Sequence, residues 1–165
     1  MNTHQLQTLT PEALDACVAR AVELFKSGFN CSQSVVAAFA PFYGYTQEQA
    51  LRMSASFGGG IGRMRQTCGA ACGLFLVAGL ETGSTDPDDR EGKAANYALV
   101  QQLGEQFKAS NGSLICADLL GLNRDANTPP TPEARTEQYY AKRPCSQIVE
   151  EAARIWADFL KKKYL

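Results

Sequence analysis

Apolar residues recur at helical spacing along most of this chain, and capping signals divide the pattern into separate helices. Thr10 and Pro11 are a typical helix start, because threonine caps well and proline fits the first turn. From there, apolar residues recur every three or four positions as far as Ser27-Gly28, which is a stop signal. They are Leu14, Cys17, Val18, Ala21, Leu24 and Phe25. The pattern predicts a first helix between these two signals.

Two further helices are predicted before a glycine-rich segment. One begins near Cys31 and continues to Tyr43, where Gly44 ends it. The other opens with a capping box, in which Gln49 occupies the third helical position after Thr46. It should stop at the glycine-rich segment, which reads Phe57-Gly58-Gly59-Gly60-Ile61-Gly62.

The next stretch, 68–80, is apolar around the whole helical circumference, so we expect it to be the central helix of the core. Asp86-Pro87 then predicts the start of a long helix that runs to Ser110, with Asn111-Gly112 as its stop. Three acidic residues near this start resemble a metal cluster, but their place in a first helical turn favours complementation of the helix dipole. They are Asp86, Asp88 and Asp89.

The last part of the chain predicts an exposed loop and an amphipathic helix. One or two turns are expected over 114–120, followed by a proline-rich exposed loop at 123–135. A final helix begins near Cys145 and repeats apolar residues at helical spacing. No stretch alternates with period two. We therefore predict an all-α, single-domain bundle of about six helices, spanning 1–165 with a flexible tail at 1–9.

Composition and charge exclude some partners. The formal net charge is −1 and no Lys/Arg-rich segment is long enough to neutralise several phosphates, which argues against nucleic acid. The longest apolar run, 70–80, covers about half of the roughly 20 residues that a membrane-spanning helix needs. The chain start does not resemble a secretory signal. We expect a cytoplasmic protein without membrane insertion, and leave open its redox partner protein and whether it forms a homo-oligomer.

Four of the six cysteines lie where a helix is predicted to begin. They are Cys31, Cys68, Cys116 and Cys145. The unpaired N–H groups and the positive dipole at a helix start favour a thiolate over a thiol. In a cytoplasmic protein, such cysteines are more often metal-binding or catalytic than structural. We expect folding to bring all four to one end of the bundle, where they would form a redox or metal site.

The remaining two cysteines carry weaker signals. Cys17 lies on the apolar stripe of the first helix, where a free cysteine behaves as a small hydrophobe. Cys72 follows Cys68 by four residues and so shares its helix face. It could be a core residue, a fifth ligand or a resolving thiol.

The glycine-rich segment is the least generic part of the sequence. Its glycines permit positive φ, so that consecutive N–H groups could form a nest for an anion, and arginines at 63 and 65 would add positive charge. The candidate cofactor-binding residues are Gly59, Gly60, Gly62, Arg63 and Gly69. Neither the dinucleotide fingerprint nor the P-loop spacing is present, so a nucleotide is not favoured. Gly69 and Gly73 would also let another helix approach closely.

The order of these motifs is specific. Cys31, then Cys68-Gly69-Ala70-Ala71-Cys72-Gly73, then Cys116 and Cys145 resemble the C_GCAxxG_C_C family of redox-active proteins, over about Phe25 to Ile155. The resemblance implies four functional cysteines and a redox role.

Several chemistries fit four converging thiolates. They suit either an iron–sulfur cluster or Zn²⁺, and the absence of Cys-x-x-Cys pairs favours the cluster, in an electron carrier or oxidoreductase. An alternative is thiol–disulfide exchange without metal, with Cys68 as a low-pKa attacker and another family cysteine as resolver. A non-catalytic metal-delivery module is a further alternative. The single histidine, His4, lies in the predicted tail, so Cys-His catalysis lacks its base. We expect Tyr139-Tyr140 to anchor the adjacent loop.

Overall fold

The computed structural model describes residues 9–124 and 128–165, and within them the all-α prediction is confirmed. These residues contain no strand, only an isolated bridge between Thr67 and Ile115. The helices are α2 (Pro11–Lys26), α3 (Cys31–Phe39), the 3₁₀ helix η1 (Ala40–Tyr43), α4 (Gln47–Ser54), the 3₁₀ helix η2 (Ala55–Phe57), α5 (Gly69–Thr82), α6 (Arg90–Asn111), α7 (Cys116–Leu119), α8 (Glu137–Lys142) and α9 (Cys145–Tyr164).

Local capping sets most helix boundaries as the sequence predicted. The Thr10 side chain accepts a hydrogen bond from the Ala13 N–H at the start of α2. The capping box of Thr46 and Gln49 is present at the start of α4. A second capping box, formed by Asn30 and Gln33, opens α3 directly before Cys31. Side-chain caps of this kind satisfy N–H groups that have no partner inside the helix.

The start of α6 differs from its prediction. The helix begins at Arg90, and its cap is Asp89, whose carboxylate accepts from the Gly92 N–H. Asp86 instead closes a turn before the helix by accepting from the Asp88 N–H. Asp86 and Asp88 therefore do not lie in the first helical turn, because a single aspartate does the capping. The predicted end is confirmed by Gly112, which has a positive φ of 91°.

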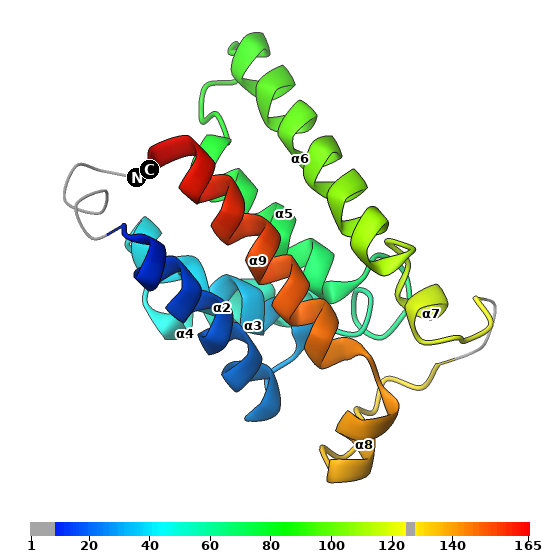
Figure 1. The fold of residues 1–165 in the computed structure, drawn as a ribbon. Coiled ribbons are helices and arrows are strands. Elements are labelled where there is room, and N and C mark those ends of the chain that lie inside the picture. The colour runs from blue at the N-terminus through cyan, green and yellow to red at the C-terminus, as the bar shows by residue number, and fades with distance from the viewer. Residues whose placement is uncertain (1–8, 125–127) are drawn as a thin grey trace.

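Helix α5 lies at the centre of the bundle, as its all-round apolarity predicted (Figure 1). It packs against α3 on one side and against α6 and α9 on others. A Cβ added at Gly73 would lie 2.9 Å from Cβ of Val35, so glycine permits the close approach of α3 and α5. Helix α9 lies along α2 and buries the fully enclosed Trp156. Among the described helices, none is both long enough and apolar enough to span a membrane.

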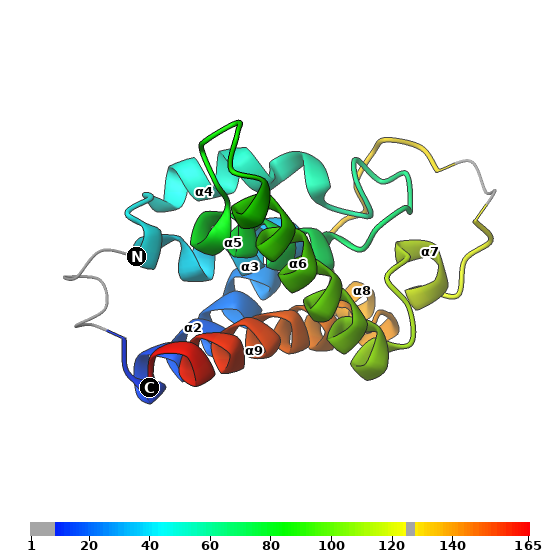
Figure 2. The ribbon, with the colours of Figure 1, turned by 90° about the horizontal axis from the view of Figure 1, so that it is seen from above.

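The elements that carry the candidate site gather at the end of the bundle where α9 begins. In two perpendicular views, the glycine-rich segment between η2 and α5, helix α7 and the segment before α8 all lie at that end (Figures 1 and 2). Residues 128–135 have no regular structure and are mostly exposed, in agreement with the predicted loop. Of the predicted tail, Leu9 is buried in the core instead. Residues 1–8, including His4, and 125–127 lie outside the described residues.

Candidate cysteine site

Each of the four family cysteines lies at a helix start, as predicted. Cys31, Cys116 and Cys145 are the first residues of α3, α7 and α9, and Cys68 is the N-cap residue of α5. The backbone N–H of Cys68 donates to Leu114 O, and that of Cys116 donates to Gln66 O. These two bonds hold the start of α7 beside the start of α5.

Folding brings the four sulfur atoms into one region. The Cys31 and Cys145 thiols, at the starts of α3 and α9, line one cavity and each shifts the pKa of the other. The pKa of Cys31 is raised by its interaction with the Cys145 thiol, by burial and by the charges that Cys68, Cys145 and Cys116 would carry. Three of the four line a cavity of about 250 Å³, whereas Cys68 belongs to the apolar core beneath it.

Cys68 does not have the low pKa that the sequence predicted. Burial raises the pKa of its thiol to about 12, although the backbone N–H groups of Ala70 and Ala71 act in the opposite direction. The side chain is only 5% exposed, so the cost of burying a charge exceeds the benefit of the helix start. Cys68 is therefore a poor attacking thiolate.

Cys145 is the thiol with the lowered pKa. The hydrogen bond from Cys31 lowers the pKa of Cys145 to about 7, against burial and with help from the guanidinium groups of Arg143, Arg135 and Arg65. A pKa near neutrality gives a substantial thiolate fraction together with good intrinsic nucleophilicity. The lowered pKa that was expected of Cys68 is thus found at Cys145.

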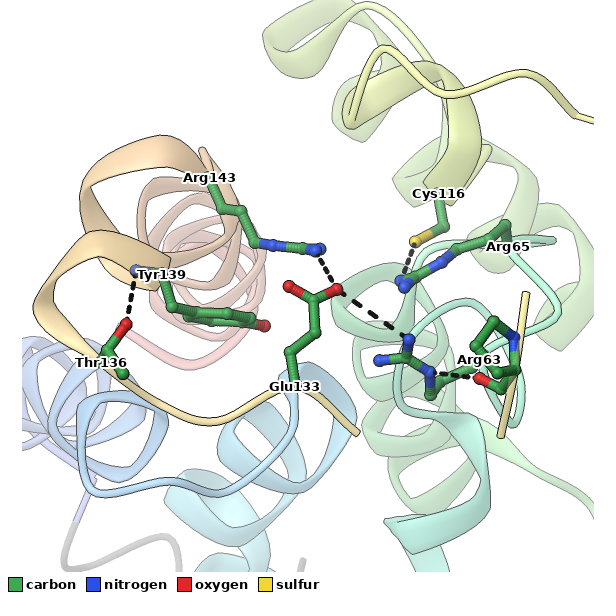
Figure 3. A network of polar contacts seen from close by, with 8 residues as sticks. Arg63, Arg65, Cys116, Glu133, Thr136, Tyr139 and Arg143 are labelled. Atoms are coloured by element: carbon green, nitrogen blue, oxygen red, sulfur yellow. Dashed lines mark hydrogen bonds and ion pairs between the residues drawn. The ribbon is translucent and has the colours of Figure 1, made fainter. Parts of the chain in front are cut away.

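Cys116 lies next to a buried arginine. Nη1 of Arg65 donates to Sγ of Cys116 at 3.8 Å, and the arginine is only 7% exposed (Figure 3). Burial still raises the pKa of Cys116, with Arg65 opposing the shift. Cys116 is therefore a protonated thiol at neutral pH.

An ion-pair network of three side chains lines the cavity. Figure 3 shows the Glu133 carboxylate between the guanidinium groups of Arg63 and Arg143. Nε of Arg63 also donates to Pro129 O at 2.9 Å, which ties the loop to the glycine-rich segment. Tyr139 lines the same cavity, and its ring centre lies 4.8 Å from the Arg143 guanidinium carbon. The neighbouring Tyr140 anchors the loop as expected, because its hydroxyl donates to Phe25 O and Lys26 O.

Part of the glycine-rich segment uses its N–H groups within the backbone. The consecutive N–H groups of 61–66 all donate to backbone carbonyls within 56–61, so these six are not free to bind an anion. The backbone winds through positive φ at Gly59, Gly60 and Gly62, and also at Ile61, Arg63 and Arg65. This left-handed course turns the arginine side chains toward the cavity, where Gly59, Gly62 and both arginines are lining residues.

Two glycines let the chain approach the cysteines closely. A Cβ at Gly60 would lie 2.6 Å from Cβ of Cys116, and one at Gly69 would lie 3.3 Å from Cβ of Cys31. Because real Cβ atoms do not approach within 3 Å, no side chain fits at Gly60 without displacing Cys116. Gly60 and Gly69 thus allow the backbone to approach Cys116 and Cys31 closely.

The two remaining cysteines lie outside the cavity. Cys17 packs against the core from a half-buried position, and burial raises its pKa to about 11. Cys72 is buried, and its thiol donates to Thr67 O at 3.7 Å. Burial also raises the pKa of Cys72 to about 11. These environments are those of structural thiols.

Some site residues were missed by sequence reasoning. Arg135, Arg143 and Glu133 lie in or beside the loop that the sequence predicted to be only exposed, and all three line the cavity. A usable signal was Arg143-Pro144-Cys145, which places a cation two residues before a family cysteine. Within 9–124 and 128–165, no three Cys, His, Asp or Glu side chains are grouped so that they could hold one metal ion.

The fold is all-helical, and three of the four helix-start cysteines line an arginine-rich cavity while Cys68 lies in the core. The chain belongs to the family described as "Putative redox-active protein (C_GCAxxG_C_C)", which matches residues 29–159. This confirms the family that the motifs suggested. The chain is also similar to a protein of Archaeoglobus fulgidus described as "Uncharacterized protein", with 28% identity over 91% of this chain and 97% of the relative. No solved structure matches the chain.

Proposed function

We propose that this redox-active protein works by thiol–disulfide exchange, with Cys145 as the attacking thiolate and Cys31 as its resolving partner. The observation that carries the proposal is that Cys31 and Cys145 line one cavity together with a group of arginines, and that each thiol shifts the pKa of the other. Two thiols that line the same cavity are placed to form a disulfide. Free thiols with such reactivity persist in a reducing compartment, which is consistent with a cytoplasmic protein.

The electron balance of this cycle is simple. The Cys145 thiolate attacks one sulfur of a substrate disulfide, forms a mixed disulfide and releases the other half as a thiolate. Cys31 transfers its proton to that departing thiolate, and its sulfur then attacks Cys145. The remaining half of the substrate leaves as a thiolate, and a Cys31–Cys145 disulfide forms. The substrate gains two electrons, which a dithiol partner protein returns to the pair by the same exchange.

The test is a thiol count on protein that has been purified without oxygen, reduced and then treated with a neutral disulfide. The native protein and the control Cys17→Ser should each lose two thiols reversibly and yield a linked peptide pair containing Cys31 and Cys145. Cys145→Ser should yield no such pair. Equal two-thiol loss in Cys145→Ser, or a linkage between other cysteines, would contradict the proposal.

The iron–sulfur cluster that the sequence favoured is the second candidate. Its supporting observation is that all four family cysteines affect one another's charge, close to four guanidinium groups that would balance an anionic cluster. Cys31, Cys68, Cys116 and Cys145 would hold it, and such a cluster accepts and donates single electrons. Anaerobic purification with iron, sulfide and visible-absorption analysis separates the candidates. Iron with sulfide supports the cluster, whereas zinc alone supports a metal-delivery module.

A further inference from the structure

The cavity beside the cysteines carries more positive than negative charge. Its lining includes four guanidinium groups, from Arg63, Arg65, Arg135 and Arg143, and one carboxylate, from Glu133. The carboxylate is engaged by Arg63 and Arg143. Arg65 and Arg135 therefore face the cavity without a carboxylate of their own among the described lining residues.

Two of these arginines have buried N–H groups without a hydrogen-bond partner. They are Nε of Arg65 and Nη1 of Arg135. Arg65 is more than nine-tenths buried, and the bond it donates is to the sulfur of Cys116. Burying a guanidinium group without a full set of acceptors is costly, so these donors indicate a site built to receive an anion.

Glu133 indicates which kind of anion fits. Its carboxylate lies between two guanidinium groups, and planar carboxylates are well matched to such donors. The Glu133 side chain is 49% exposed, whereas the Arg63 and Arg143 side chains are each 18% exposed. The arginines are thus held by the surrounding protein, while the carboxylate can rotate into solvent. The cavity is also small, at about 250 Å³, near the lower limit of small-molecule sites.

We propose that the cavity binds a small carboxylate-bearing disulfide, whose carboxylate replaces that of Glu133 between Arg63 and Arg143 while its sulfur lies against Cys145. This inference rests on the proposed thiol–disulfide function and names its substrate class. The arginines orient the substrate, and Glu133 competes with it. A neutral disulfide of the same size lacks the group that the arginines recognise.

The experiment compares two probes, the dianionic 3,3′-dithiodipropionate and the neutral bis(2-hydroxyethyl) disulfide. The rate at which each oxidises the reduced protein is divided by its rate with a free small-molecule thiol. The native protein should prefer the dianion by roughly tenfold or more, the gain expected from charge-assisted hydrogen bonds. Glu133→Gln should raise this preference, and Arg143→Gln should abolish it. The matched control Glu105→Gln, which removes the surface pair with Lys108, should leave it unchanged.

A second measurement does not depend on redox chemistry. Glutarate, which has carboxylates but no sulfur, should bind by calorimetry more tightly to Glu133→Gln than to the native protein, and not to Arg143→Gln. Arg63→Gln serves as a second variant if Arg143→Gln does not fold. If glutarate does not bind and both disulfides react at equal relative rates, the anion site is overturned while the exchange function stands. If glutarate binds but neither disulfide oxidises the pair, the disulfide substrate proposed here falls with the exchange function.

Discussion

Removing the Cys31 thiol should make Cys145 much less reactive at neutral pH. With its pKa lowered to about 7, Cys145 is roughly half ionised at pH 7, whereas a thiol at the ordinary value of 9.0 is only about 1% ionised. The hydrogen bond from Cys31 is the largest cause of the shift, and the guanidinium groups act in the same direction. Cys31→Ala removes the first cause and keeps the second, so the pKa should rise by one to two units, or about 1.4 to 2.7 kcal/mol.

The assay is alkylation of Cys145 by iodoacetamide across pH 5 to 10, with the modified peptide quantified by mass spectrometry. Because only the thiolate reacts, the rate at pH 7 should fall roughly fivefold to fiftyfold in Cys31→Ala. Cys31→Ser keeps a hydroxyl donor and should lie between this variant and the native protein. The control Cys17→Ala removes a thiol outside the cavity and should not move the midpoint.

The sign of the effect is fixed by the lowered pKa. A group whose pKa is lowered stays ionised to lower pH, so the native midpoint should lie near pH 7 and that of Cys31→Ala at higher pH. A native midpoint near 9, or an unchanged midpoint in Cys31→Ala, would refute the role given to the hydrogen bond.

Two further predictions compare matched pairs. Gly60→Ala should destabilise the protein by about 2–4 kcal/mol and Gly62→Ala by about 1–2 kcal/mol in urea unfolding, because both have positive φ but only Gly60 has no room beside Cys116. Equal losses would show that the contact with Cys116 is unimportant. Cys68→Ser should reduce redox activity or metal occupancy more than Cys17→Ser, because Cys68 lies within charge range of the other family cysteines. Roughly equal effects in either assay would count against its place in the site.

Local signals in the sequence predicted most of the fold. Thr10 with Pro11, the Thr46 capping box and Gly112 mark boundaries through contacts within four residues, so they can be recognised without tertiary information. The start of α6 was wrong because several aspartates compete as caps, and the choice depends on the turn before the helix. Helix α8 was missed because it is short and lies behind a proline-rich loop.

The candidate site was only partly predictable, because some of its properties depend on residues that are far apart in the sequence. The positions of the cysteines at helix starts followed from local sequence, and the family motif identified which four matter. Their relative acidity did not follow, because it depends on burial and on partners more than 100 residues away. Cys68 is set deep in the core, while Cys145 receives a hydrogen bond from Cys31 and charge from Arg135. Only the folded chain determines which thiol is acidic.

The pairing of Cys31 with Cys145 also has a mechanical consequence. These residues begin α3 and α9, so a covalent link between them would close a loop of about 115 residues and restrict the unfolded chain by about 5 kcal/mol on a chain-entropy basis. The oxidised form should then melt at a distinctly higher temperature than the reduced form in calorimetry, and coincident melting curves would contradict this. Loss of two electrons would thus stabilise the folded bundle and gain of two electrons would destabilise it, and susceptibility to proteolysis would record the oxidation state of the surroundings.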